Sequence, residues 1–574
     1  MHRCRAATVW VVAFFSWFHF ASASAEVQFP ELPPAIDANL RAYLSLDDLD
    51  CSASVADLAR ARRSAVDEIT EALQAVGYYE PSFELDFKQT DSCWLATLEL
   101  NPGEPVRYRS VSVVLEGDEK TDDRLQTAIA SAPKVGAVLH HGEYTSFKRM
   151  IQRLLAARGY AEARVSPAEL RVVPNERAVD LSMTIRTGPR YKIASVLIDD
   201  TVFDAGLIDR LVFLEEGDYF DRAALTRQQQ NLQSSALIGS ARVDADLQTN
   251  DEHTVDVRVA IDPVERIGYF IGAGVSTDRG PRVRGGYRNR RVNSRGHQID
   301  IDLRTSPVLS DFSARYRRPL EDPLVEWASY QLVLSSESTD TSESDAGQLG
   351  WERVRILSDD WISTYGVQAS QTRFTVAEVR NETTLLMPVI GLSRRAADRP
   401  SNPRRGSATD INLRAASSTI ISSTDFIQLY VRQRVLYPIG AKGRLRLWGE
   451  AGYTWRDDFD ELPPEIRFFA GGDNSVRGYD FETIGPRNAE GQVIGGSRLA
   501  AASIEYEHDV ATAFGIAAFF DIGSAFDGST PDWQRGTGVG VVWRSPVGPL
   551  RAYLAHALDG ERGLRLHVSF GGDL

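Results

Sequence analysis

The sequence predicts a tandem of small α+β modules followed by an all-β, 16-stranded transmembrane antiparallel barrel. Three observations support this fold class. A unit of helix, glycine and strands recurs at intervals of about 80 residues through the first half of the chain. From residue 266 onward the helical period disappears, and short segments alternate apolar and polar residues. The chain also begins with a segment that has the layout of an export signal.

Residues 1–25 are predicted to be a signal peptide. A basic start at residues 2–5 precedes a mostly apolar run over 9–20, and Ala23-Ser24-Ala25 gives a small-x-small cleavage pattern. A membrane anchor is the alternative, but His19 interrupts a run that is already short. No later segment approaches the ~20 apolar residues that a spanning helix needs. We therefore expect an exported chain without a helical anchor.

Composition excludes several classes of function. The chain has 574 residues and a net charge of -15, and no basic stretch dominates, which argues against a nucleic-acid partner. The sequence holds no phosphate-binding glycine loop, no HExxH and no GxSxG. His140 and His141 are adjacent and would not face one metal from a strand. We expect no enzyme activity, no metal and no cofactor.

The cysteines predict a disulfide in the first module. Cys4 leaves with the signal peptide, so Cys51 and Cys93 are the two that reach an oxidising compartment. They lack the CxxC spacing of a redox or zinc site. We expect them to be bonded to each other, with two buried thiols as the alternative.

Three repeat units are expected between the signal peptide and the barrel. Glycine just past a helix commonly adopts a left-handed cap, and each unit has an amphipathic stretch that runs into one. Two alternating segments and a proline-containing turn then complete the unit. The stretches and glycines are 55–76 with Gly77, 144–158 with Gly159, and 225–238 with Gly239. The expected boundaries are 26–105, 106–188 and 189–264, with the barrel at 265–574.

This order of elements resembles the POTRA domains of the Omp85 superfamily. Two of the joints carry tyrosine after the glycine, whereas the third has Gly239-Ser240, so its assignment rests on order and spacing. The resemblance implies that the modules dock clients and partners by strand pairing at sheet edges, where unpaired N–H and C=O groups are available. The alternative is one mixed globular domain.

The second half of the chain has the alternation of membrane strands. In one segment Ile427, Leu429 and Val431 face one way, and the polar residues between them face the other. A soluble β-sandwich would place the apolar face inside instead. Segments of about ten residues and aromatic residues near their ends favour the barrel. We count 16 candidate strands between residues 266 and 570, an even number as expected for bacterial barrels.

Three motifs in the barrel half resemble signatures of Omp85 proteins. Residues 468–479, FFAGGDNSVRGY, are similar to the superfamily's lumen loop, whose core is VRGY. Residues 519–523, FFDIG, are similar to its aromatic-Asp-x-Gly strand, and residues 402–406, NPRRG, resemble its NPxRG turn with Arg404 at the variable position. Together with the modules, the resemblance covers essentially the whole chain after the signal peptide.

We interpret the glycine-rich motif as a latch inside the lumen. An arginine in a partly closed lumen is costly unless it meets a carboxylate that offers two oxygens. We expect Arg477 to pair with Asp521, glycines such as Gly478 to let the backbone pack against the wall, and Tyr479 to stack there. Val476 belongs to the same latch. The alternative is an ordinary hairpin tip on the surface.

A seam between the first and last strands is expected to open sideways. Glycine weakens strand pairing and permits kinking, and both ends of the barrel are rich in it. The alternative is that these glycines merely fit close packing. The expected seam residues are Gly268, Gly272, Gly274, Gly563, Phe570 and Gly571.

Three modules, rather than two or five, make the chain most similar to the outer-membrane subunits of translocation and assembly modules. That resemblance implies an insertase in the bacterial outer membrane with its modules in the periplasm. It implies autotransporters and other barrel proteins as clients that enter the lipid bilayer through the seam. It also implies a TamB-like periplasmic partner anchored in the inner membrane. The alternative is a two-partner-type secretion pore that exports an unfolded passenger through the lumen.

Overall fold

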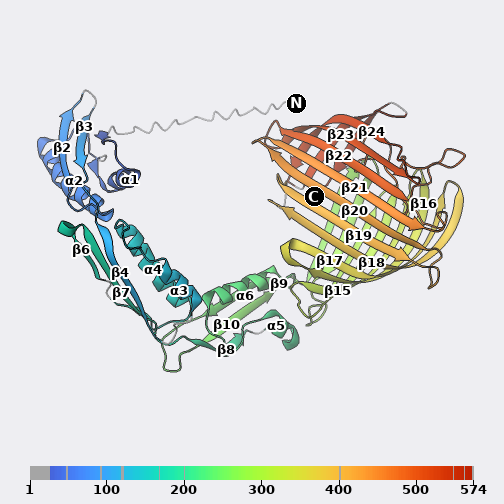
Figure 1. Ribbon diagram of the computed structural model, residues 1–574. Helices are drawn as coiled ribbons and strands as arrows, with labels where there is room; N and C mark the ends of the chain where they lie inside the picture. Colours follow the sequence, from blue (N-terminus) through green and yellow to red (C-terminus); the bar gives the residue numbers. More distant parts are fainter. Residues whose placement is uncertain are drawn as a thin grey trace, which may run out of the picture. The chain divides into compact units, whose positions relative to one another are not determined.

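A computed structural model describes most of the chain (Figure 1). The described residues are 26–46, 49–90, 93–117, 122–166, 169–199, 201–399, 402–546, 548–560 and 563–571. The signal peptide expected at 1–25 and the last three residues of the glycine-containing tail lie outside them. Within the described ranges, no helix is both long and apolar enough to cross a membrane.

The first module packs two helices on a three-stranded sheet with the order β1-β3-β2. Ser54 caps the longer helix in a capping box with Asp57, and Gly77 ends it with a φ of 94°. Cys51 and Cys93 form a disulfide. The elements are β1 (Glu26–Gln28), α1 (Pro34–Tyr43), α2 (Val55–Ala75), β2 (Ser82–Gln89) and β3 (Trp94–Asn101).

The next two sheets repeat this plan. In the second sheet β7 is central, with the order β4-β7-β5 and β6 also paired to β7. In the third the order is β8-β10-β9. The second set of elements is β4 (Arg107–Glu116), α3 (Asp123–Ala130), α4 (His141–Ala157), β5 (Arg164–Val165), β6 (Glu169–Val173) and β7 (Ala178–Arg186). The third set is β8 (Lys192–Ile198), α5 (Ala205–Leu211), α6 (Arg222–Ser234), β9 (Ile238–Ala245) and β10 (Thr254–Pro263).

One expected helix end is wrong. Gly77 and Gly159 have left-handed backbones with φ of 94° and 87°, as a cap requires. Gly239 instead lies inside strand β9, because α6 already ends at Ser234. The hydroxyl of Ser235 accepts a hydrogen bond from the N–H of Leu237, so a serine turn ends this helix instead of a glycine.

Sixteen strands form one antiparallel sheet in chain order, from β11 to β26, which confirms the predicted barrel and its strand number (Figure 1). Side chains alternate as predicted: Ile427 is 50% exposed, whereas the neighbouring Gln428 is 2% exposed. The strands are β11 (Ile267–Ser276), β12 (Gly280–Asn289), β13 (Gln298–Thr305), β14 (Leu309–Pro319), β15 (Glu326–Ser338), β16 (Ser342–Ile356), β17 (Trp361–Val376), β18 (Val379–Ala397), β19 (Gly406–Ala416), β20 (Phe426–Ile439), β21 (Gly443–Arg456), β22 (Arg498–Asp509), β23 (Phe514–Phe526), β24 (Gln534–Ser545), β25 (Gly548–Ala557) and β26 (Leu564–Phe570).

Candidate functional site

The segment 457–497 between β21 and β22, here called the lid, is packed against the inner wall of the barrel. Three isolated β-bridges shape it: Phe468 to Gly496, Ala470 to Ile484, and Arg487 to Val493. Apolar lid residues and wall residues form one buried cluster, so the lid has a core of its own. The cluster comprises Phe468, Ala470, Val476, Tyr479 and Ile484 of the lid, with Leu499, Ala525 and Ala557 of the wall.

Arg477 and Asp521 form the ion pair expected from their motifs. The Nε atom of Arg477 lies 2.8 Å from Oδ2 of Asp521, and Nη2 lies 2.9 Å from Oδ1. The backbone N–H of Arg477 donates to the same carboxylate at 3.0 Å. The arginine side chain is 6% exposed and the aspartate is fully buried. Two parallel bonds between buried groups fix both the position and the orientation of the lid.

Four further partners of Arg477 were not expected. Glu505 accepts from Nη1 at 2.5 Å, and Ser503 accepts from Nη2 at 3.2 Å. The guanidinium carbon lies 3.5 Å from the centre of the Phe519 ring and 4.6 Å from that of Tyr553. Ser503 and Glu505 stand at alternate positions of β22 and carry no motif. The sequence could have indicated these two residues only through the alternation of β22, which points every second side chain into the barrel.

The lid approaches the wall closely where glycines line both surfaces. Gly478 has a φ of 103°, and a Cβ there would lie 2.9 Å from the backbone nitrogen of Ala557. A Cβ on Gly536 of β24 would lie 1.9 Å from the carbonyl oxygen of Arg477. Tyr479 donates its hydroxyl to the carbonyl of Asp559 at 2.9 Å. Any side chain at Gly536 would therefore push the lid from the wall.

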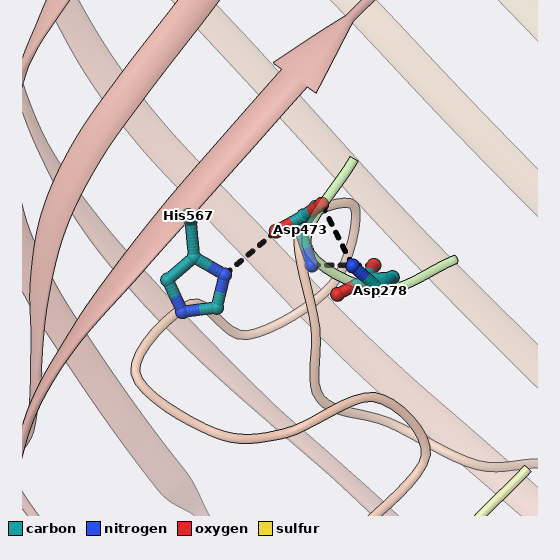
Figure 2. A group of neighbouring side chains, drawn as sticks. All are labelled: Asp278, Asp473 and His567. Carbon is teal, nitrogen blue, oxygen red and sulfur yellow. Dashed lines mark hydrogen bonds and ion pairs between the residues drawn. The ribbon is translucent and has the colours of Figure 1, made fainter. Parts of the chain in front are cut away.

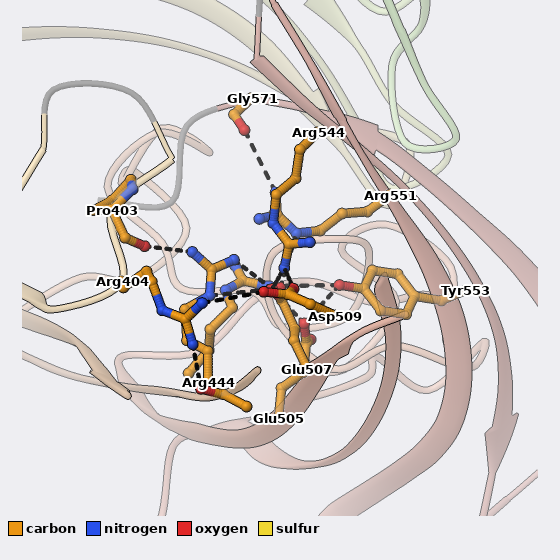
Figure 3. Close-up of polar contacts among 12 residues, drawn as sticks. Pro403, Arg404, Arg444, Glu505, Glu507, Asp509, Arg544, Arg551, Tyr553 and Gly571 are labelled. Atoms are coloured by element: carbon orange, nitrogen blue, oxygen red, sulfur yellow. Dashed lines mark hydrogen bonds and ion pairs between the residues drawn. The ribbon is translucent and has the colours of Figure 1, made fainter. Parts of the chain in front are cut away.

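A second buried charge cluster joins the NPRRG turn to the wall (Figure 3). Arg444 pairs with Glu507, and its Nη1 also donates to the carbonyl of Pro403. Arg404 bonds Asp509 at 3.2 Å. The motif's variable position thus carries a side chain that ties this turn to β22. Arg544 and Arg551 complete the cluster around the two carboxylates.

The seam between β11 and β26 is joined far more weakly than the other strand pairs. Neighbouring strands elsewhere in the barrel share continuous ladders of 7 to 16 residues on each strand. Between the described residues of the first hairpin and β26, one backbone bond is present, from the N–H of Thr277 to the carbonyl of Val568 at 3.1 Å. The Thr277 hydroxyl accepts from the N–H of Val568 at 3.0 Å. Arg282 also donates to the carbonyl of Phe570 at 3.0 Å.

The predicted seam glycines differ in their surroundings. A Cβ on Gly272, Gly563 or Gly571 would meet no atom within 4 Å. One on Gly274 would lie 2.9 Å from Nε of Arg282, and one on Gly268 would contact Arg290. Close packing therefore does not require the first three glycines. Of these three, only Gly272 lies within a strand, β11, whereas Gly563 and Gly571 flank β26.

Asp278, Asp473 and His567 bring the first hairpin, the lid and the last strand together (Figure 2). Each residue offers one possible metal-ligand atom, and these three atoms lie within 4.8 Å of one another, so they could bind a cation. In the structure Asp473 and His567 bond to each other, Nδ1 to Oδ1 at 2.7 Å, and Asp278 accepts from the N–H of Asp473 at 2.8 Å. Burial, followed by the charge of Asp473, raises the pKa of Asp278 to about 7.

Comparison with known families matches both halves of the chain. Residues 311–573 match the model of the Omp85 superfamily domain. Residues 32–102 match the model of POTRA domain TamA domain 1.

Two similar proteins are named outer membrane protein assembly factor BamA. That of Nitratidesulfovibrio vulgaris is 24% identical over 449 residues, which cover 73% of this chain and 55% of the relative. That of Neisseria meningitidis serogroup B is 22% identical over 570 residues, covering 86% and 70%. This chain thus spans little more than half the length of the first relative.

A solved structure has the same fold. BamA from Haemophilus ducreyi lacking POTRA domains 1-3 matches with a TM-score of 0.67 at 15% identity, covering 80% of this chain and 98% of that chain. At this identity the likeness shows the fold alone, and it agrees with the predicted class of POTRA-type modules followed by a barrel.

Proposed function

We propose that this chain, an outer-membrane barrel with periplasmic POTRA modules, inserts barrel proteins into the outer membrane through the seam between β11 and β26. The match of residues 311–573 to the Omp85 superfamily domain supports the proposal. The clients would be autotransporters and other barrel proteins, as for subunits of the TamA type. A match of the first module to the TamA model supports this branch of the superfamily.

The observation that carries this proposal is the weak seam. A client strand needs an edge with unpaired N–H and C=O groups, and most of β11 has no bond to β26 among the described residues. Tyr269 and Ile271 on that strand are 78% and 85% exposed. Opening a seam held by so few bonds costs far less than breaking a full ladder elsewhere in the wall.

A TamB-like protein anchored in the inner membrane is the proposed partner of the modules. Each module sheet ends in edge strands, such as β1 and β2 of the first, which can add a strand from a partner. No phosphate-binding glycine loop supplies nucleotide energy. Client folding would then drive insertion.

A reversible crosslink of the seam tests this function. Thr277 and Val568 are bonded across it, so their neighbours Ser276 and Ser569 are suitable positions for a cysteine pair, in a background where Cys51 and Cys93 are serine. We expect the oxidised pair to block assembly of an autotransporter in membranes and reductant to restore it. The matched control is S335C with A346C, which locks two strands already paired in register.

If assembly continues with the seam locked, lateral insertion is wrong. Export of an unfolded passenger through the lumen, as in a two-partner-type secretion pore, would then be the function to test. Such export would require the buried lid core to leave the lumen, because it packs directly against the wall.

A further inference from the structure

We infer that Thr277, Asp473 and His567 form a clasp that ties the lid to both sides of the seam, the turn after β11 and the strand β26, so that the seam opens only when the clasp is released. The inference rests on the proposed function, because it concerns how that seam is controlled. The three residues belong to three separate parts of the barrel: the first hairpin, the lid and β26 (Figure 2 shows Asp473 and His567).

Asp473 is the centre of the clasp. Its side chain is 1% exposed, although it lies beside the least paired part of the wall. One carboxylate oxygen accepts from the Thr277 hydroxyl at 2.6 Å and from Nδ1 of His567 at 2.7 Å. Its backbone N–H donates to Asp278 at 2.8 Å. A single lid residue therefore bonds both sides of the seam, the turn that follows β11 and the strand β26.

His567 reaches the lid at a second point. Its Nε2 accepts a hydrogen bond from the backbone N–H of Gly478 at 2.9 Å, and its other ring nitrogen donates to Asp473. Both contacts are satisfied by one neutral tautomer, with the proton on Nδ1. Gly478 directly follows Arg477, so the last strand is bonded to the same turn that the buried ion pair fixes to β22 and β23.

Thr277 completes the connection through one hydroxyl group. The hydroxyl donates to Asp473 and accepts from the N–H of Val568, so it links lid and last strand to the first hairpin. The neighbouring backbone bond to Val568 lies at the same point. The contacts that close the seam and those that hold the lid thus share atoms, and loss of one set removes support from the other.

The geometry predicts coupled motion. If the lid moves away, Asp473 leaves, and the seam retains the two bonds between Thr277 and Val568 and the contact from Arg282, without the carboxylate that orients the Thr277 hydroxyl. If a client strand displaces β26, His567 leaves and Gly478 loses its acceptor. Asp473 and His567 are therefore positioning residues, which act by holding the lid and the seam together.

Distances across the seam test the clasp without any client. Spin labels at Leu303 of β13 and Leu554 of β25 lie four strand spacings apart across the seam, about 19 Å at ~4.8 Å a strand. Labels at Leu349 of β16 and Ile427 of β20 are also four strand spacings apart, across fully paired strands, and serve as the control. All four side chains are exposed, and the native cysteines are bonded to each other and take up no label.

Thr277→Val is isosteric and removes only the hydroxyl, whereas Asp473→Ala removes the carboxylate. We expect each variant to increase the distance between the labels at Leu303 and Leu554 by as much as one strand spacing, about 4.8 Å. Thr277→Ser keeps the hydroxyl and should keep the wild-type distance. The double variant T277V/D473A should shift no further than the single variants, since both remove one clasp. The control distance should stay constant in every variant.

Unchanged seam distances in T277V and D473A would overturn the clasp, as would an equal change in the control pair, which would mean general loosening. The assembly assay with the locked seam is a separate measurement. If the variants widen the seam but assembly survives locking, the clasp stands and the insertase proposal falls. If locking blocks assembly but the variants leave the seam closed, the insertase stands and the clasp falls.

Discussion

Arg477 has its guanidinium engaged on nearly every side. Asp521 takes two of its bonds, Glu505 and Ser503 take one each, and the Phe519 ring lies against its face. Burying so many charged groups is not stabilising by itself, but leaving one without its partner is strongly destabilising. At the scale of single residues, the lid therefore depends on complete pairing rather than on the number of charges.

Removal of this arginine should destabilise the folded barrel. Arg477→Ala leaves Asp521 and Glu505 buried with less compensation, and we expect a loss of about 3–5 kcal/mol in the free energy of unfolding. Folded and unfolded fractions can be separated by heat-modified migration on gels across a urea series. Arg373→Ala, which removes an exposed pair with Glu382, is the matched control and should change little. Equal midpoints for the two variants would contradict the assigned importance of Arg477.

The raised pKa of Asp278 predicts a pH-dependent stability. A carboxyl with a pKa near 7 when folded, against 3.8 ordinarily, binds more protons in the folded state. Its contribution is therefore greatest below pH 4 and is lost as pH rises towards 7. Asp473 and Glu482 of the lid, His567 of β26 and Arg279 of the hairpin face it.

The variant Asp278→Asn isolates this contribution, because every facing group stays in place. The quantity to follow is the melting temperature of the wild type minus that of D278N. We expect this difference to fall between pH 5 and pH 7 and then to stay level above about pH 7.5. Thermal unfolding at intervals of one pH unit measures this difference. A difference that is constant from pH 5 to 8 would show that Asp278 titrates normally.

At the scale of elements, the lid and the wall fit because glycines stand where backbones meet. Gly536 is the third residue of wall strand β24, where glycine weakens pairing, yet it faces the carbonyl of Arg477. The contact joins β24 to the lid at the residue that also holds the ion pair. At this position glycine weakens the pairing of β24 but allows the lid backbone to approach the wall closely.

Gly536→Ala should displace the lid without removing any charge. The added methyl would lie 1.9 Å from the carbonyl oxygen of Arg477, a distance that no rotamer change relieves. We expect faster cleavage of the lid by an added protease while the barrel stays folded on gels. Gly528→Ala is the control, because a Cβ there meets no atom within 4 Å. Equal cleavage of the two variants would show that the wall adjusts.

Sequence patterns predicted elements and motif residues better than the contacts between distant strands. The alternation of Ile427 and Gln428 indicated which side chains of that strand point into the barrel. The need of a buried arginine for a carboxylate indicated Asp521. Glu505 and His567 carry no local signal, since their roles arise from strand register and from where the lid lies. The expected cap at Gly239 was wrong because a serine turn ends the helix instead.

At the scale of the whole molecule, the first module is built to fold by itself. Its buried core uses only residues between 36 and 98, and the disulfide joins two of its loops. The barrel has its own cluster beneath the lid. Separate cores allow one part to be removed while the other keeps its stability. Partner binding and membrane insertion can therefore be tested independently.

Deletion of residues 26–105, with the signal peptide joined to residue 106, should separate these two roles. We expect the barrel to reach the outer membrane and to keep its heat-modified migration, because no barrel core residue is lost. Capture of a TamB-like periplasmic protein should fall at least tenfold if the edge strands of the first sheet bind it. The control is the full chain with Cys51→Ser and Cys93→Ser, which loses the disulfide but keeps the sheet edges. Undiminished capture by the deletion variant would place the partner on another module, and loss of the barrel itself would show that the first module is needed for insertion.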